Sequence, residues 1–444
     1  MTRAAWAGAG MIVTTALLAG CGAGLATGGE DQEVTLTVAT FGVMGFDDLY
    51  EQYEKTHPGV TIEATNYEQS GDARATLFEG LENGEGMSDV VALEEGWLGQ
   101  AMAESDKFVD LRDHHIETSS WRWLEWKYKQ GTAPTGAVIG AGTDIGPMGL
   151  CYRRDLFEAA GLPTDRKQVA ELFQQDGGDW ERYFEVGRQY HATTGKAWYD
   201  QPTFVWNAMV NQLDEGYYNI DGDIIAGENE ALAEKWGLVA QANADGLSAR
   251  ETPWDWRGGK AFTDDSFATF MCPGWMIGHI KTQLEAAGGG PETGWDFADV
   301  FPGGSANWGG SFLAVPESSE HPDEAAELVL WLTEAEQQAE AFKVAGTFPS
   351  TEEMIHIFST EPVDGDPVFG GAPIAKLLAQ RTEGVRAQFK GPLDSQIQED
   401  AFGDSLRAMD AGDLSPDEAW QQAIGRVQEL ETKGSITLPE EGEE

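Results

Sequence analysis

Alternating and amphipathic hydrophobic patterns predict a run of strands and helices early in the chain. Segments 34–38 and 60–62 alternate apolar and polar residues as strands do, and 89–93 is a short apolar run typical of a buried strand. Helical spacing of apolar residues predicts helices over 46–55 and 73–81. Strands that alternate with helices form a parallel sheet covered on both faces, so these residues predict an α/β fold.

Similar patterns recur in the second half of the chain. Segment 308–315 predicts a strand that ends at Pro316, followed by one helix with Pro322 in its first turn. The apolar face of that helix is predicted to consist of Leu328, Leu332, Ala335, Ala339 and Phe342. A further helix is expected within 405–430, started by the segment 415–418, and a hairpin turn is expected after Tyr218.

Length and composition indicate a folded protein with more than one domain. The chain has 444 residues, which is too long for one compact core, so two domains are expected. A hydrophobic content of 41% with 16 tryptophans excludes a disordered chain. The balance of 76 acidic against 28 basic residues gives a net charge of -48, which repels phosphate backbones and anionic lipid headgroups. Nucleic-acid binding is therefore not expected.

The first 20 residues have the layout of a secretory signal. A single early charge at Arg3 precedes an apolar run over 11–18, and small residues then lead to Cys21. The sequence Leu-Ala-Gly-Cys at 18–21 resembles the lipobox of bacterial lipoproteins. This resemblance implies cleavage before Cys21 and lipidation of Cys21. The Gly, Ala, Thr and acidic residues that follow predict a flexible tether, so 21–33 is expected to link the anchor to the folded part. The alternative is a plain secretory signal, and either reading places the mature protein outside the cytoplasm.

Two further cysteines, Cys151 and Cys272, remain in the mature chain. An exported protein can join such a pair in a disulfide, and the alternative is two buried free thiols. The sequence does not show that the two are close in space. We take the disulfide as the working hypothesis.

Four blocks of sequence resemble the extracellular sugar-binding proteins of ABC importers, known as extracellular solute-binding protein family 1. The blocks are 142–163, 268–275, 307–316 and 346–350, in the order and spacing of the family. The similarity covers about residues 34–430. Segment 41–45 and the cysteine pair most closely resemble the cello-oligosaccharide-binding lipoproteins of actinobacteria.

The resemblance implies a two-lobed periplasmic-binding-protein-like fold, with a three-crossing hinge and a ligand cleft between the lobes. Carried onto this chain, the first lobe would hold residues 30–143 and 304–348, and the second 144–303 and 349–444. The expected ligand is a di- or oligosaccharide, and the expected protein partners are the transmembrane subunits of an ABC permease. A monomer without a cofactor or metal is expected, held to the membrane through its lipid anchor alone.

Sugars need polar partners for their hydroxyls and aromatic rings for their C–H faces, and these needs select the candidate contacts. Glu94 and Glu95 follow the strand 89–93, and Asp144 precedes a turn where the chain should change lobes. Without the family these acids would be ordinary solvated or turn residues, and the aromatics would fill cores. The resemblance gives as candidates Phe41, Glu94, Glu95, Asp144, Phe204, Trp206, Trp275, Trp308 and Gly309, with Trp254 and Trp256 after them.

Two other classes of protein remain as alternatives. An exported glycoside hydrolase would also use carboxylates and aromatics, but it requires two carboxyls about 5–10 Å apart, and with 76 acids such pairs arise by chance. A structural surface lipoprotein would need no ligand cleft. Serine hydrolase and zinc protease chemistry is not supported, since the motifs Gly-x-Ser-x-Gly and His-Glu-x-x-His are absent.

Overall fold

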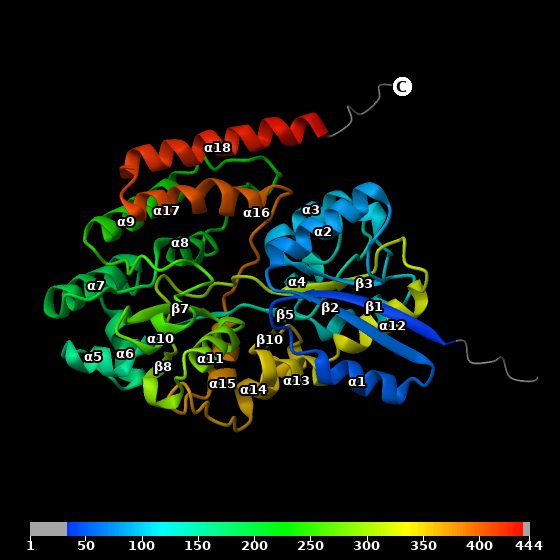
Figure 1. Ribbon diagram of the computed structural model, residues 1–444, viewed down its shortest axis with the longest axis horizontal. Coiled ribbons are helices and arrows are strands. Elements are labelled where there is room, and N and C mark those ends of the chain that lie inside the picture. The colour runs from blue at the N-terminus through cyan, green and yellow to red at the C-terminus, as the bar shows by residue number, and fades with distance from the viewer. Residues whose placement is uncertain (1–32, 438–444) are drawn as a thin grey trace, which may run out of the picture.

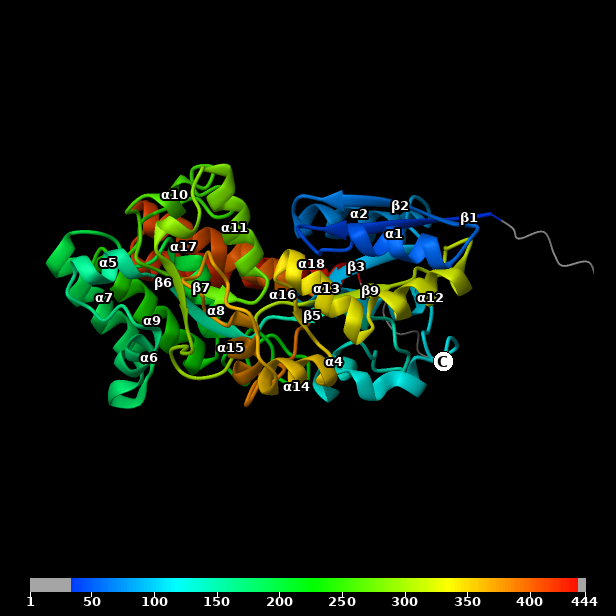
Figure 2. The same ribbon diagram turned by 90° about the horizontal axis from the view of Figure 1, so that it is seen from below.

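A computed structural model describes residues 33–437. The expected signal, Cys21 and all of the expected tether except Glu33 lie outside the described residues, as does the end of the chain from 438 onward. Figures 1 and 2 show two groups of elements joined by a narrow set of connecting segments. The elements therefore form two lobes.

The first lobe is built on a five-stranded sheet of order β2-β1-β3-β9-β4. Its strands are β1 (Val34–Phe41), β2 (Val60–Tyr67), β3 (Val90–Glu94), β4 (Ala141–Gly142) and β9 (Ser311–Ala314). Strand β1 pairs in parallel with β2 and β3, whereas β9 is antiparallel to β3 and β4. The predicted parallel βαβαβ unit is thus confirmed at the start of the chain.

Helices cover both faces of this sheet (Figure 1), because neighbouring residues of a strand point to opposite faces. In β3, Val90 and Ala92 pack with one cluster of buried residues, and Val91 and Leu93 pack with another. The first cluster includes helices α1 (Asp47–Thr56) and α12 (Pro322–Leu332), and the second includes α2 (Ser70–Asn83) and α3 (Glu95–Ala103). Helix α4 (Glu125–Gln130) packs near β4.

The second lobe is built on a three-stranded antiparallel sheet of order β7-β6-β8. The strands are β6 (Met148–Arg153), β7 (Thr269–Pro273) and β8 (Trp295–Ala298), and all their residues are buried. The helices around them are α5 (Arg154–Ala159), α6 (Arg166–Gln174), α7 (Trp180–Thr194), α8 (Pro202–Val210), α9 (Glu230–Ala244), α10 (Lys260–Thr263), α11 (Met276–Ala286), α15 (Ile374–Arg381), α16 (Asp394–Gln396), α17 (Asp404–Ala411) and α18 (Pro416–Thr437), with a π-helix η5 (Ile397–Gly403) between α16 and α17. Within this sheet a disulfide joins Cys151 of β6 to Cys272 of β7.

Three connections run side by side between the lobes. The chain leaves the first sheet after β4 and enters the second at β6, and it returns between β8 and β9. A third crossing follows β10 (Phe348–Pro349), which pairs with β5 (Asp144–Ile145) of the first connection. The first and second connections also pair, through a bridge between Pro147 and Asn307. Helices α13 (Ala335–Ala345) and α14 (Glu352–Thr360) flank the third connection.

Two expectations for the second half of the chain were wrong in detail. The single helix expected after Pro322 is split into α12 and α13, because the backbone leaves the helical path around Thr333, whose hydroxyl bonds back to the carbonyl of Val329. The strand expected over 308–315 begins only at Ser311. Gly309 and Gly310 have φ angles of 79° and 111°, which an extended strand does not allow.

Other local predictions are confirmed. The hydroxyl of Ser415 accepts from the backbone N–H of Glu418, whose carboxylate accepts from the backbone N–H of Ser415 in return, so a capping box starts α18. Tyr218 and Ile224 form an antiparallel bridge around the expected hairpin turn. None of the helices between residues 33 and 437 is long and apolar enough to cross a membrane.

Candidate binding site

Five aromatic side chains lie together next to the connections between the lobes; four belong to the second lobe, and the fifth belongs to the second connection. Trp254 stacks on Trp275, with ring centroids 6.2 Å apart and planes 27° apart. Trp275 meets Trp308 edge to face at 5.6 Å. Phe204 contacts both Trp254 and Trp308 at 5.4 Å, and Trp256 packs behind at 5.6 Å from Phe204. We call these five residues the aromatic cluster.

Exposure differs sharply within the aromatic cluster. Trp254 is 42% exposed and Trp275 is partly exposed, whereas Phe204, Trp256 and Trp308 are buried. The buried three therefore support the two rings that remain open to solvent. A large, partly exposed aromatic pair on a rigid base is a surface suited to stacking an apolar ligand face.

The loop that carries Trp254 has an unusual backbone. Residues Arg250, Trp254, Trp256 and Arg257 all have positive φ angles, between 40° and 66°. Residues other than glycine rarely adopt this conformation, because their Cβ atoms crowd the backbone there. Backbone strain of this kind persists only where surrounding contacts enforce it, and it concentrates at functional sites.

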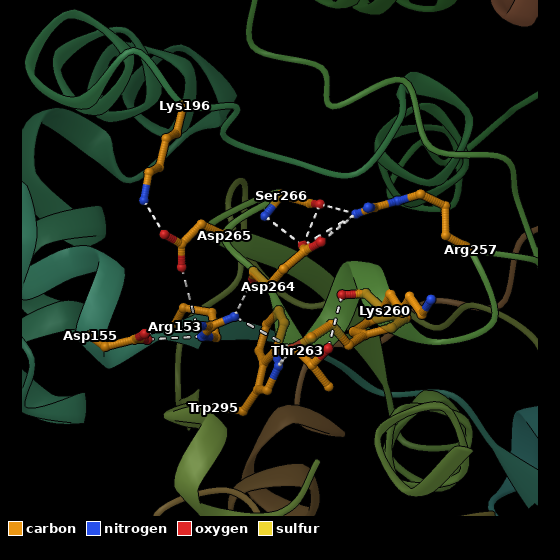
Figure 3. Close-up of polar contacts among 11 residues, drawn as sticks. Arg153, Asp155, Lys196, Arg257, Lys260, Thr263, Asp264, Asp265, Ser266 and Trp295 are labelled. Atoms are coloured by element: carbon orange, nitrogen blue, oxygen red, sulfur yellow. Dashed lines mark hydrogen bonds and ion pairs between the residues drawn. The ribbon is translucent and has the colours of Figure 1, made fainter. Parts of the chain in front are cut away.

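An ionic network fastens this strained loop to the body of the second lobe (Figure 3). The Arg257 guanidinium donates to the Glu251 carboxylate at 3.0 and 3.1 Å and pairs with the Asp264 carboxylate at 2.9 Å. The Asp264 carbonyl in turn accepts from Nη1 of Arg153 at 2.7 Å, and Arg153 is bidentate to Asp155. Trp254 is thus presented on a loop that is held at its base.

Trp275 is tied to the second connection between the lobes. Its indole N–H donates to the carbonyl oxygen of Trp308 at 2.7 Å. A Cβ atom at Gly309 would lie 2.9 Å from the same indole nitrogen, and Gly309 has a φ of 79°. The glycine is required both for its backbone conformation and for the close approach of the indole. Trp308 and Gly309 therefore hold Trp275 in place.

Glu94 lies where β3 ends and α3 begins, as the sequence predicted. It is partly exposed, and its Oε1 accepts from the backbone N–H of Gly96 at 3.0 Å. Burial raises the pKa of Glu94 to about 8, with a further increase from the neighbouring Glu95 and Glu399. A carboxyl with a raised pKa takes up a proton more readily, and in its protonated form it can donate a hydrogen bond as well as accept one.

Glu95 is only 4% exposed, and its carboxylate is hydrogen-bonded to the second connection between the lobes. It accepts from the backbone N–H of Gly309 at 3.0 Å and from the side chain of Gln130 at 3.0 Å. The Asn307 amide lies 3.4 Å from both of its oxygens, and Oδ1 of Asn307 accepts from the Gly146 N–H of the first connection. The structure therefore places Glu95 in the hinge, where protein donors already occupy its oxygens.

Replacing Glu95 with alanine is expected to lower the free energy of unfolding by about 1–3 kcal/mol, because the buried N–H of Gly309 would lose its acceptor and the Asn307 amide would keep only the Gly309 carbonyl. Glu95→Gln keeps an oxygen at the same position and is expected to cost less. Urea unfolding of both variants measures the difference. Full stability of Glu95→Ala, with lost ligand binding, would instead make Glu95 a ligand contact.

Asp144 also lies in the hinge rather than in the aromatic cluster. It is 3% exposed, and its Oδ1 accepts from the Thr143 hydroxyl at 2.7 Å and the Ser311 N–H at 2.8 Å. Burial raises its pKa, and the nearby Lys127 opposes that shift. Lys127 itself is buried, 3.7 Å from the centroid of the Phe312 ring, and burial lowers its pKa to about 8.

The remaining candidates take different positions. Phe41 is the last residue of β1, and its ring centroid lies 6.2 Å from that of Trp97 in the first lobe. The following residue, Gly42, approaches the second lobe, since a Cβ there would lie 3.9 Å from Nε2 of His279. Trp206 has no exposed surface; it stacks on Phe402 and its N–H donates to the Tyr217 hydroxyl, so it packs in the core of the second lobe.

Three features of the site lay outside the main sequence candidates. Trp254 was only a secondary candidate from the sequence, because a tryptophan between Pro253 and Asp255 gives no periodic signal. The ring centroid of His279 lies 5.7 Å from that of Trp254 and 5.9 Å from that of Trp275, and burial lowers the pKa of His279. Asn207 follows Phe204 by one helical turn on α8, and among the described residues its Oδ1 has no hydrogen-bond partner. The spacing of Phe204 and Asn207 was the signal that could have found the last of these.

Across residues 33–437, no three His, Cys, Asp or Glu side chains are grouped so as to hold a metal ion. The site is instead one of aromatic rings, carboxyl groups and amides, placed beside a hinge between two lobes.

Comparison with known proteins gives the family. The model of the bacterial extracellular solute-binding protein family matches residues 48–368. The chain belongs to this family. A solved extracellular solute-binding protein of family 1 is 43% identical and has a TM-score of 0.78, with 89% of this chain and 99% of that chain covered.

More distant relatives of this solute-binding protein are named for sugars. The lactose-binding protein of Rhizobium radiobacter is 28% identical over 299 residues, which are 65% of this chain and 67% of that protein. A binding protein of B. animalis subsp. lactis, solved in complex with beta-1,6-galactobiose, shares the fold with a TM-score of 0.74 at 18% identity, covering 90% of this chain and 98% of that chain. These relatives are binding proteins, so the glycoside hydrolase considered from the sequence is not supported.

Proposed function

We propose that this chain is the substrate-binding component of an ABC importer that captures a di- or oligosaccharide, such as a cello-oligosaccharide, between its lobes and delivers it to a membrane permease. The observation that carries the proposal is the aromatic cluster, with Trp254 and Trp275 open to solvent beside the hinge. The C–H face of a pyranose ring stacks on such indoles.

Polar groups of the right kind accompany these rings. The partly exposed Glu94 of the first lobe and Asn207 of the second can exchange hydrogen bonds with sugar hydroxyls. The relatives support a sugar as the ligand class, since they include the lactose-binding protein and an arabinooligosaccharide-binding protein of Halalkalibacterium halodurans, 21% identical over 60% of this chain and 58% of that protein.

The proposed division of the chain follows the three connections. Residues 30–143 and 304–348 form one lobe, and residues 144–303 and 349–444 form the other. A ligand that touches both lobes binds the closed form more tightly than the open form, so it shifts the population toward closure. The protein works as a monomer, because one chain supplies both lobes.

A panel of neutral sugars tests the proposal. Purified protein is incubated with cellobiose, longer cello-oligosaccharides, lactose and arabinooligosaccharides, and both thermal stability and sugar products are measured. Stabilisation by one sugar class without turnover is the expected result, since a ligand that binds only the native state raises its stability. Release of monosaccharide would indicate a hydrolase, and no response to any sugar would favour a structural surface lipoprotein.

Lipid anchoring is a separate part of the proposal. The Leu-Ala-Gly-Cys sequence at 18–21 supports acylation of Cys21, and lipid chains hold a protein to a bilayer by about 0.8 kcal/mol per buried methylene. Cys21→Ser is expected to move the protein from the membrane fraction to the soluble fraction. Fractionation and immunoblotting of cells that express each form measure this, and unchanged partitioning would exclude Cys21 as the anchor.

A further inference from the structure

Helix α3 of the first lobe packs directly against the second lobe at a point outside the three connections. A Cβ atom at Gly99 of α3 would lie 2.3 Å from the carbonyl oxygen of Lys390 and 2.6 Å from the carbonyl carbon of Gly391. These neighbours are backbone atoms, which cannot rotate away as a side chain can. Any residue larger than glycine at position 99 must therefore push the two surfaces apart.

The facing segment belongs firmly to the second lobe. Nζ of Lys390 donates to Oδ1 of Asn211 at 3.0 Å and lies 3.5 Å from the Asp394 carboxylate. Gly391 packs against the ring of Tyr218, which a Cβ would approach to 2.3 Å. Figure 1 shows α16 beside α3, and the two elements are in contact. We call the contact between α3 and segment 390–400 the seam.

The seam carries an excess of negative charge. Glu399 and Asp400, in the π-helix η5, are exposed and lie within electrostatic range of Arg74 on α2. Arg74 already donates to Gln100 of α3 at 2.7 Å. The charged and titratable groups around Glu94 are Arg74 of α2, Glu95 of α3, Lys127 of α4, Lys390 and Glu399. At the seam, four carboxyl groups (Glu94, Asp394, Glu399 and Asp400) lie near two cations, Arg74 and Lys390, whereas Glu95 and Lys127 belong to the hinge.

We propose that the seam is the closure contact of the two lobes: it forms when they close, Gly99 allows its close fit, and negative charge on the Glu94 and Asp394 carboxyls opposes it. The proposal extends the proposed function, because closure is the motion by which such a protein holds its ligand. Gly99 lies on α3 away from the aromatic cluster, so it affects ligand binding only through the fit of the two lobes.

The direction of the pH dependence follows from Glu94. Its ordinary pKa of 4.5 rises to about 8 in this structure, in which the seam is formed, mainly through burial. Opening the seam exposes this partly exposed carboxyl more fully to water and lowers its pKa toward the ordinary value. Protonation therefore favours the closed form, and this preference is complete below about pH 4.5 and is lost as pH rises to about 8. Asp394, with a pKa raised to about 6 by burial, acts in the same direction.

A matched pair of glycine variants tests the steric part. Gly99→Ala is compared with Gly237→Ala, which lies in helix α9 where a Cβ meets nothing within 4 Å. Small-angle scattering is measured without ligand and with saturating cellobiose, and circular dichroism confirms folding. We expect a larger radius of gyration and about tenfold weaker cellobiose binding for Gly99→Ala alone, since a less populated closed state lowers apparent affinity. Identical scattering and affinity of the two variants would overturn the proposal.

The unmodified protein tests the charge part without any substitution. Its radius of gyration is expected to increase between pH 5 and pH 8.5, over the range in which the Glu94 carboxyl ionises. Glu94→Gln is expected to flatten that increase. A radius that stays constant with pH in the unmodified protein would refute proton-linked closure. If no sugar binds any form, the proposed function fails, but the scattering of ligand-free protein still decides whether the seam opens.

Discussion

Replacing Trp275 with alanine is expected to weaken sugar binding by at least about tenfold, or about 1.4 kcal/mol. The indole lies at the N-terminus of α11, held by its bond to the Trp308 carbonyl and stacked on Trp254. A large aromatic side chain offers about 150–250 Å² of surface, and partial burial against a sugar at about 25 cal/mol per Å² amounts to a few kcal/mol before costs. Removing Trp254 as well is expected to bring the loss to about a hundredfold.

Isothermal titration with the sugar identified from the panel measures this loss. Trp121→Ala is the matched control, because Trp121 is 70% exposed and lies in the 3-10 helix η2 (Ile116–Arg122) of the first lobe, outside the aromatic cluster. The control should bind normally. Normal affinity of folded Trp275→Ala, together with reduced stability, would show that Trp275 only packs within the second lobe.

Removal of the disulfide is expected to lower the free energy of unfolding by about 3–5 kcal/mol. Cys151 and Cys272 are 121 residues apart in sequence, so the bond closes a long loop in the unfolded chain. Long loops give the largest entropic stabilisation, about 4.7 kcal/mol for 100 residues, and real bonds often give less. The Cα atoms are 5.7 Å apart on adjacent antiparallel strands, within the usual range for a disulfide.

Urea unfolding of the double variant Cys151→Ser/Cys272→Ser measures the effect against the unmodified protein. Dithiothreitol should destabilise the unmodified protein and leave the variant unchanged. Sugar affinity of the folded variant should stay near normal, since neither cysteine belongs to the aromatic cluster. Two alkylatable thiols in unreduced, unfolded protein would show that the bond does not form.

The first half of the first lobe was predictable from the sequence because its signals are local. Alternation over 34–38 and the apolar run 89–93 require a buried sheet, and these segments became β1 and β3. The helix 322–342 was predicted as continuous because its apolar spacing does not change at Thr333. The break there depends on a hydroxyl that bonds back to the preceding turn, which periodicity does not report.

Local sequence patterns did not predict which way the side chains of the candidate site point. Glu94 and Glu95 are adjacent acids after one strand, yet Glu94 stays partly exposed while Glu95 turns into the hinge toward Gly309. The partner lies 214 residues away in sequence, so no spacing rule connects the two. The different exposure of Trp206 and Trp254 has the same cause. Trp206 is buried against Phe402 and Trp254 is exposed on a strained loop, and both surroundings are set by distant parts of the chain.

The aromatic cluster also makes this protein its own optical reporter. Indole emission moves to shorter wavelength when water leaves the ring, and Trp254 and Trp275 are the members of the cluster that now face water. Most of the other tryptophans between residues 33 and 437 are buried, and the exposed Trp121 lies in the first lobe outside the aromatic cluster, so ligand should leave their emission largely unchanged. A change in intrinsic fluorescence on adding a sugar would therefore come mainly from the cluster, and the chain could serve as a label-free carbohydrate sensor without an attached dye.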